Sequence, residues 1–298
     1  MSTVARLRAL VAVAEAGSVR EAAHRLTVTE PAVSAALGAL AREVRVPLVE
    51  RDGRGLRLTS AGAAYADYAR RILGLHEEAL AAARASQDAG RGLVRVAAVP
   101  TAGEHLLPAV LASFLAAHPH VDLRLEVGTS ERMWAMFAAH EADVVIGGLP
   151  PAHTSAAVIR ATRPNLLVVV ASAAVAATFD PAATRWLQRE PGSATRAHGE
   201  SLLATLDADP PRLTLGSTGA VIAGAVAGLG ATLVPREAVR QQLAAGELAE
   251  LPVPGTPLRR PWRAVTHVTT PAAAMLLIRH LIGQGGWRDH RPDSKAIV

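Results

Sequence analysis

The strongest constraint on the fold comes from two helix starts that lie close together near the N-terminus. Ser18 opens a capping box with Glu21, in which the hydroxyl and the carboxylate each bind a free backbone amide. Thr29 caps a second helix start, and Pro31 fits its first turn because no amide partner is needed there. Only a short helix and a tight turn fit between the two starts. This arrangement predicts a helix-turn-helix.

The flanking sequence supports the same interpretation. Apolar residues between 4 and 14 recur at helical spacing, and Gly17 ends that helix. In the third helix the predicted buried stripe is Val33, Ala36, Leu37 and Leu40. The residues left on its outer face are small enough to approach a DNA groove closely, and they are Glu30, Ala32, Ser34 and Ala35. A plain three-helix bundle is the alternative.

A hairpin follows the three helices. Residues 47–51 and 54–58 can pair around Asp52 and Gly53, a dipeptide that favours tight hairpin turns. Its tip carries Arg51, Arg54 and Arg57. A basic hairpin beside a helix-turn-helix is typical of a wing that lies along phosphates or places an arginine in the minor groove. A solvated turn is the alternative.

The segment from 60 to about 89 is predicted to form one long helix. Small and apolar residues follow one another there at alternating spacings of four and three, as in a heptad seam, and they are Ala61, Tyr65, Tyr68, Ile72, Leu75, Ala79 and Ala82. We assign Tyr65, Tyr68, Ile72, Leu75 and Ala79 to a dimer interface, because a lone helix would leave this seam unused. Packing of the seam on the chain's own core is the alternative.

The N-terminal region resembles the LysR-type transcriptional regulators. The matching segments occur in the family's order, and they are RLRALVAVAEAGS (6–18), EAAHRL (21–26), TEPAVS (29–34), VPLVER (46–51) and LTSAG (58–62). The resemblance implies a homodimer or homotetramer, a third helix that enters the major groove and a wing that enters the minor groove.

The pattern and the resemblance together give a set of predicted DNA contacts: Ser18, Arg20, Thr29, Glu30, Pro31, Ala32, Ser34, Ala35, Arg51, Arg54 and Arg57. The family usually has glutamine where Glu30 stands, and a longer polar side chain near Ala35. A carboxylate accepts from cytosine but repels phosphate, and alanine offers a methyl contact to thymine. The resemblance therefore does not carry the family's base preference over to this chain.

The remaining two hundred residues alternate between strand and helix patterns. Predicted strands at 93–99, 121–127 and 143–147 enclose predicted helices at 103–118 and 130–140, which is the order of a parallel, doubly wound sheet. A second unit begins near 163, with predicted strands at 166–170, 183–187, 213–216 and 231–235. Residues 263–268 and a helix at 271–282 return to the first unit.

The overall prediction is therefore an α/β chain with an all-α winged helix-turn-helix, a long dimerisation helix and a two-lobed domain like a periplasmic binding protein. The LysR regulatory domain has this shape. The predicted boundaries are 1–59 for the winged domain, 60–90 for the helix and 91–298 for the effector domain. Lobe 1 takes residues 91–162 and 266–285, and lobe 2 takes 163–265.

Ligands of such sheets bind where strands end and helices begin, because free amides and the helix dipole favour anions there. Four hydroxyl-bearing loops and one glycine have this position and match cleft positions of LysR-type proteins: Pro100, Thr101, Ala102, Thr129, Ser130, Gly148, Ser193, Thr195, Arg196, Ser217 and Thr218. Arg196 indicates an anionic effector, since a guanidinium among hydroxyls suits a carboxylate or phosphate. Simple helix capping is the alternative for each loop.

Composition excludes several other classes. The chain of 298 residues has no cysteine, so disulfides and thiolate chemistry are absent. The net charge of +5 is too mild to identify a partner by itself. The eleven histidines lack metal-site spacing, and no cofactor loop or nucleophile motif is present, so we expect no metal, no cofactor and no enzyme.

No signal peptide precedes the first helix pattern, and no apolar run reaches membrane length, which predicts a cytoplasmic protein without membrane contact. The expected partners are double-stranded DNA, a small anionic effector, further copies of the chain and RNA polymerase. A solute-binding protein with an unrelated helical N-terminus and a doubly wound enzyme are the competing hypotheses.

Overall fold

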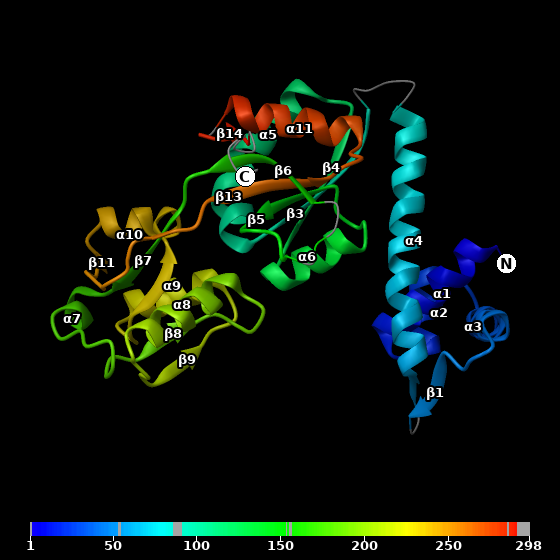
Figure 1. Ribbon diagram of the computed structural model, residues 1–298, viewed down its shortest axis with the longest axis horizontal. Helices are drawn as coiled ribbons and strands as arrows, with labels where there is room; N and C mark the ends of the chain where they lie inside the picture. The colour runs from blue at the N-terminus through cyan, green and yellow to red at the C-terminus, as the bar shows by residue number, and fades with distance from the viewer. Residues whose placement is uncertain are drawn as a thin grey trace, which may run out of the picture. The chain divides into compact units, whose positions relative to one another are not determined.

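The computed structural model describes residues 2–52, 55–85, 91–152, 154, 157–284 and 286–290. The chain divides into two compact units (Figure 1). The first contains Met1–Arg84 with Ala138–Glu141, and the second contains Ala85–Phe137 with Ala142–Val298.

The first unit is built from helices and one hairpin: α1 (Thr3–Ala16), α2 (Val19–Leu26), α3 (Glu30–Val44), β1 (Val49–Asp52), β2 (Gly55–Leu58) and α4 (Ser60–Ala85). A side-chain oxygen caps each of the first three helices. Ser2 accepts from Ala5 N, Ser18 from Glu21 N and Thr29 from Ala32 N. The predicted capping box is only half formed, because the Glu21 carboxylate accepts from Arg25 Nε at 3.3 Å. These caps explain where each helix begins.

The core of the first unit confirms the predicted stripe of α3. Val33, Ala36, Leu37 and Leu40 are all buried. They pack with apolar residues of α1, α2 and the start of β1. Because burial of a leucine side chain contributes about 1.5–3 kcal/mol, this core holds the three helices at fixed angles.

Gly62 allows α4 to begin against the hairpin. Thr59 Oγ1 accepts from Gly62 N at 2.9 Å and donates to Pro47 O at 2.7 Å. A Cβ on Gly62 would lie 1.8 Å from the carbonyl oxygen of Leu48. No side chain fits at that distance, so this position requires glycine.

The second unit consists of two lobes. Lobe 1 contains β3 (Gly92–Ala98), the π-helix η1 (Ala102–Leu106), α5 (Leu107–Ala117), β4 (Val121–Val127), α6 (Ser130–Ala138), β5 (Val144–Gly147), β6 (Ala157–Arg163), β13 (Trp262–His267), α11 (Ala272–Gly283) and β14 (Arg288–Asp289). Its sheet has the order β14-β6-β13-β5-β3-β4. Helices α5 and α11 cover one face, and α6 covers the other (Figure 1).

The predicted parallel sheet is confirmed for three strands of lobe 1. β3 pairs in parallel with β4 and with β5. The other strands depart from that expectation, because β13 is antiparallel to β5 and β6, and β14 is antiparallel to β6. β13 joins the sheet from Trp262, a few residues before the expected return at 266.

Lobe 2 contains β7 (Leu166–Ala171), α7 (Ala173–Ala176), β8 (Trp186–Gln188), α8 (Ala194–Thr205), β9 (Arg212–Thr214), α9 (Thr218–Val226), β10 (Thr232–Pro235), the short helix η2 (Arg236–Val239), α10 (Arg240–Ala244), β11 (Ala249–Glu250) and β12 (Leu258–Arg259). Strands β10, β11 and β12 are antiparallel to β7. Alternate residues of β7 pack toward α8 and toward α9, so both faces of this strand are buried.

The chain crosses between the lobes twice, after β6 and after β12. The two crossings are hydrogen-bonded to each other. Arg260 N donates to Asn165 O at 3.0 Å, and Asn165 Nδ2 donates to Arg260 O at 2.9 Å. Across the described residues, no helix is both long enough and apolar enough to span a membrane.

Candidate nucleic-acid interface and effector cleft

The first half of α3 presents the predicted recognition face. Thr29, Glu30, Pro31, Ser34 and Ala35 are exposed, and Ala32 is half-buried. Exposure of these side chains follows from burial of the opposite stripe. The helix therefore presents a narrow surface of small residues with a single carboxylate.

The start of α2 lies in the same small domain. Ser18 is half-buried and caps α2, and Arg20 is exposed in the first turn of the helix. The first amides of a helix and its dipole favour a phosphate at this end. Both α2 and α3 therefore offer an N-terminus suited to phosphate.

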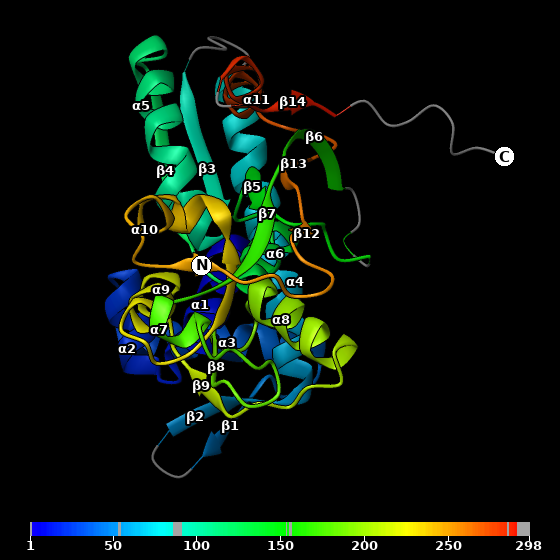
Figure 2. The ribbon, with the colours of Figure 1, turned by 90° about the vertical axis from the view of Figure 1, so that its left-hand side faces the viewer.

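The hairpin is a two-stranded ribbon in which Val49 pairs with Leu58 and Asp52 with Gly55. Figure 2 shows it projecting beyond the helices of its unit. Arg57 forms an ion pair with Glu50 across the ribbon at 2.6 Å, so its charge is partly balanced. Arg54 lies outside the described residues, and the side chain of Arg51 is not described.

Helix α4 carries two different faces. Ala66 and Ala69 are buried, and Ala61 and Tyr65 pack against the same core. Tyr68 is 62% exposed, and Ile72 and Leu75 are each 49% exposed. The predicted seam is therefore divided: Tyr65 belongs to the chain's own core, whereas Tyr68, Ile72, Leu75 and Ala79 form an exposed stripe.

A cavity of about 60 Å³ lies between the two lobes. On the lobe 1 side its wall comes from loops that follow β3, β4 and β5. On the other side it comes from lobe 2 and the crossings. The residues that line it are Val99, Pro100, Thr101, Thr129, Ser130, Gly148, Asn165, Leu167, Arg189, Ser193, Ala194, Thr195, His198, Pro235, Arg260 and Trp262.

Arg189 lies in the cavity wall with its charge already paired. Its Nε and Nη2 donate to the two carboxylate oxygens of Glu190 at 2.7 and 2.6 Å, and its Nη1 donates to Thr218 Oγ1. Burial acts to raise the pKa of Glu190, but the hydrogen bonds and charge of Arg189 outweigh it and leave that pKa below its ordinary value. Arg189 is therefore held in a partly buried ion pair with Glu190.

Arg260 supplies the cavity with a cation that has no carboxylate partner among the described residues. Its Nε donates to His198 Nδ1 at 3.5 Å, and its Nη1 donates to the carbonyl of Arg259 at 3.2 Å. Burial, and then the charge of Arg260, lower the pKa of His198. His198 is therefore neutral at pH 7, and Nε2 carries its proton because Nδ1 accepts from Arg260.

Trp262 contributes a donor that the fold leaves unused. The residue is 6% exposed and lines the cavity. Its Nε1 is buried and has no hydrogen-bond partner in the described part of the chain. A buried N–H without a partner costs about 1–3 kcal/mol, so an acceptor at this place would stabilise the protein.

Comparison with protein families assigns both units. The family model described as "Bacterial regulatory helix-turn-helix protein, lysR family" matches residues 4–63, and the model described as "LysR substrate binding domain" matches residues 87–285. The chain belongs to the LysR family of transcriptional regulators. The suspected resemblance, the fold class and the function as a DNA-binding regulator with an effector domain are thereby confirmed.

Individual relatives of this LysR-type regulator extend over nearly its full length. It is 34% identical to the HTH-type transcriptional regulator CbbR of Rhodospirillum rubrum, covering 89% of this chain and 91% of the relative. It is also 34% identical to the RuBisCO operon transcriptional regulator of Acidithiobacillus ferrooxidans, covering 89% and 87%. The solved structure of full-length CbnR complexed with its target DNA matches with a TM-score of 0.64 and 25% identity, covering 94% of this chain and 98% of CbnR.

The cavity brings together most of the predicted effector residues of this LysR-type regulator: Pro100, Thr101, Thr129, Ser130, Gly148, Ser193 and Thr195. Ala102, Ser217 and Thr218 are not in its wall. Ser217 caps α9 by accepting from Ala220 N, and Thr218 holds Arg189. Thr129 Oγ1 caps α6 by accepting from Arg132 N at 3.3 Å.

Arg196 does not occupy the position expected of it. Its Nε donates to Glu200 Oε1 at 2.8 Å on the same helix, and its Nη1 donates to the carbonyl of Arg189 at 3.3 Å. The side chain therefore lies along α8 and is absent from the cavity wall. Arg260 brings positive charge to the cavity instead, since the charge of Arg189 is paired with Glu190.

Sequence reasoning missed Asn165, Arg189, His198, Arg260 and Trp262. Asn165 and Arg260 lie on the two crossings, Arg189 directly follows β8, and Trp262 begins β13. These residues come together only through contacts between segments that are far apart in the sequence. The crossings of a two-lobed fold border its cleft. The arginine and tryptophan at 260 and 262 could therefore have been predicted from the sequence as cleft residues. His198 lies one turn into α8, after the loop that carries Ser193.

Proposed function

We propose that this LysR-type regulator binds its operator with α3 in the major groove and the hairpin on the adjoining phosphates and minor groove. We further propose that a small anionic effector binds between the lobes and that RNA polymerase is the downstream partner. The observation that carries the effector assignment is the cavity, in which the Arg260 guanidinium has no carboxylate partner and the Trp262 indole N–H has no hydrogen-bond partner among the described residues.

The DNA-binding part is supported by the exposed face of α3. Ser34, Ala35 and Glu30 lie on one exposed surface beside the capped N-terminus of the helix. The solved CbnR structure is a complex with target DNA, and this chain matches it over 94% of its length. Phosphate contacts from Ser18, Arg20, Thr29, Arg51, Arg54 and Arg57 position the domain, while Ser34, Ala35, Pro31, Ala32 and Glu30 meet base edges.

The dimerisation part is supported by the exposed stripe of α4. Tyr68, Ile72 and Leu75 expose about half or more of their surface, which is unusual for large apolar side chains in one row. A second α4 helix packed on this stripe removes it from water and brings two winged domains together. We therefore propose that residues 1–59 bind DNA, residues 60–90 dimerise and residues 91–298 bind the effector.

The effector part is supported by the chemistry of the cavity wall. Hydroxyls of Thr101, Thr129 and Ser193 accompany the Arg260 guanidinium and the Trp262 indole N–H. This set offers donors at several points and a single unbalanced charge, which suits a carboxylate or a phosphate. The volume of about 60 Å³ admits only a small part of a ligand, so an effector binds with a change in the distance between the lobes.

The effector assignment is tested by titrating the purified regulator with small organic acids and size-matched neutral amides, followed by calorimetry. We expect an acid to bind and the matching amide to bind at least tenfold more weakly. Arg260→Ala is expected to weaken the acid about tenfold or more, because a charge-assisted hydrogen bond is lost. Trp262→Phe keeps the ring and removes the donor, so we expect a smaller loss of about fivefold.

Arg259→Ala is the matched control, since Arg259 is the neighbouring arginine and is not part of the cavity wall. It is expected to leave binding unchanged. Tight binding of a neutral apolar compound that is insensitive to Arg260→Ala would show that the effector is not anionic.

A further inference from the structure

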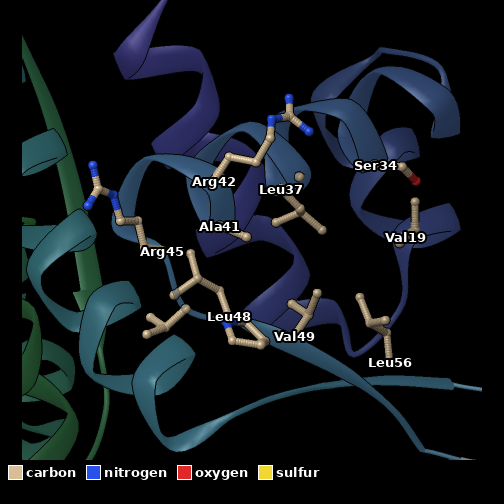
Figure 3. A pocket seen from close by; sticks show the side chains of 12 residues that line it. Val19, Ser34, Leu37, Ala41, Arg42, Arg45, Leu48, Val49 and Leu56 are labelled. Atoms are coloured by element: carbon tan, nitrogen blue, oxygen red, sulfur yellow. The ribbon is translucent and has the colours of Figure 1, made fainter.

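A groove of about 580 Å³ runs along α3 in the winged domain (Figure 3). Leu37 and Ala41 of α3 form one wall, and Val49 and Leu56 of the hairpin form the opposite wall. Ser34 lies at one end of the groove, so the groove begins on the recognition face. Its walls are mostly apolar, and its charged members are two arginines.

These two arginines, Arg42 and Arg45, have no ion pair or side-chain hydrogen bond within the described part of the chain, and both are exposed. Several other arginines of the same unit are in ion pairs, among them Arg25 with Glu21, Arg57 with Glu50 and Arg70 with Asp67. Two like charges one turn apart on a helix repel each other. The groove therefore carries a local positive charge that the domain does not neutralise.

Arg45 adds a second unfavourable feature. It ends α3 in the left-handed conformation, with φ of 59°. Glycine is the usual residue at such a helix end, because a Cβ is strained there. The guanidinium contacts no acidic group among the described residues, so no ion pair within the domain accounts for an arginine at this position. Its role is therefore to be sought in a ligand.

The geometry of a duplex identifies that ligand. The major groove and the adjoining minor groove are separated by one sugar–phosphate strand. If α3 enters the first and the hairpin reaches the second, that strand passes between them, over the groove that α3 and the hairpin enclose. Apolar walls suit the faces of deoxyribose, and unpaired arginines suit phosphates.

We infer that the groove between α3 and the β1–β2 hairpin seats one sugar–phosphate strand of the operator, and that Arg42 and Arg45 bind phosphates of that strand. The inference rests on the proposed function, because it requires α3 and the hairpin to lie on one duplex. It extends the DNA interface along α3 from Ser34 to the end of the helix.

The test measures binding of the full-length regulator to a fluorescent duplex from the gene's own upstream region over a series of salt concentrations. Arg42→Ala and Arg45→Gly are each expected to weaken binding on the order of tenfold. Each lost phosphate contact lowers the slope of log K against log salt by about 0.9, or about 1.8 for a dimer altered in both copies. The preferred sequence is expected to stay the same, because phosphate contacts carry no base information.

Arg45→Gly separates DNA binding from folding. Glycine relieves the left-handed strain, so the melting temperature of this variant is expected to stay the same or rise while DNA affinity falls. Arg279→Ala is the control for net charge, because Arg279 is an exposed residue of α11 in the other unit. It is expected to leave the salt slope unchanged.

Ser34→Ala and Arg51→Ala distinguish failure of the groove to bind DNA from failure of the proposed docking of α3 and the hairpin. If these two variants alter binding and Arg42→Ala and Arg45→Gly do not, the groove is not a seat for DNA, although the proposed docking holds. If none of the four matters, the docking itself is wrong. If Arg42→Ala and Arg45→Gly bind DNA normally but fail to regulate transcription in a purified system, the groove receives an acidic protein segment and the inference is overturned.

Discussion

His198 shows how a single residue can link the cleft to pH. It lies in the wall of the cavity, and its Nδ1 faces the Nε of Arg260. Burial and the neighbouring charge lower its pKa, so the folded protein disfavours its protonated form. An anion in the cavity would reverse that balance by offering a partner to the protonated ring.

This balance predicts the direction of a pH effect. Without ligand, the unfolded chain holds the proton more readily than the native state, so the contribution of His198 to stability falls as pH drops below about 6.5. A bound anion raises the pKa of His198, and binding then takes up a proton. Affinity for a fully ionised organic acid is expected to rise as pH falls from about 7.5 to 6.

His198→Gln should flatten this rise, because glutamine does not titrate, and calorimetry at several pH values measures the difference between the two proteins. An equal pH dependence of acid affinity in the parent and the variant would remove His198 from the effector site.

At the scale of the element, one face of α4 packs on the core of the winged domain and another face is exposed. Ala66 and Ala69 fix it to the core of the winged domain, and Gly62 lets it start within reach of the Leu48 carbonyl. Tyr68, Ile72 and Leu75 remain exposed on another face. The heptad pattern alone did not separate these faces, because the first two turns of the seam and its later turns look alike in sequence. Only the position of the three-helix core distinguishes Tyr65 from Tyr68.

Ile72→Glu tests the exposed stripe. Because Ile72 is 49% exposed in the single chain, the change is expected to leave the fold intact. A carboxylate in the middle of a helix–helix contact should weaken the dimer at least tenfold, as measured by analytical ultracentrifugation. Ala63→Glu places the same charge on another exposed face of α4 and is expected to leave the assembly unchanged. A dimer equally stable in both variants would show that α4 does not hold the copies together.

At the scale of the whole molecule, local patterns predicted the order of elements better than their pairing. Strands β3, β4 and β5 were predictable because a helical segment separates each from the next, which is the order of a parallel sheet. The antiparallel place of β13 was not predictable, because its partners lie about a hundred residues earlier. The same distance hid Arg260 and Trp262 from sequence reasoning, whereas hydroxyl loops such as Thr129 and Ser193 followed from strand ends alone.

Coupling between the cleft and the operator is the defining expectation for the intact regulator. If the effector changes operator affinity by some factor, the operator must change effector affinity by the same factor, typically about 5 to 150. Both factors are measurable on one preparation, by titrating DNA with and without effector and effector with and without DNA. An effector that binds in the cleft and leaves operator affinity unchanged would show that the cleft does not regulate DNA binding.

The reciprocal hydrogen bonds between Asn165 and Arg260 have a mechanical consequence. They tie the two crossings into one short pivot, and Arg260 belongs both to that pivot and to the cavity wall. A molecule that pulls on the Arg260 guanidinium therefore acts close to the axis of rotation, where a displacement of a fraction of an ångström becomes a larger arc at the outer edges of the lobes. A small compound bound at Arg260 would in this way displace the outer edges of the lobes, which it does not contact.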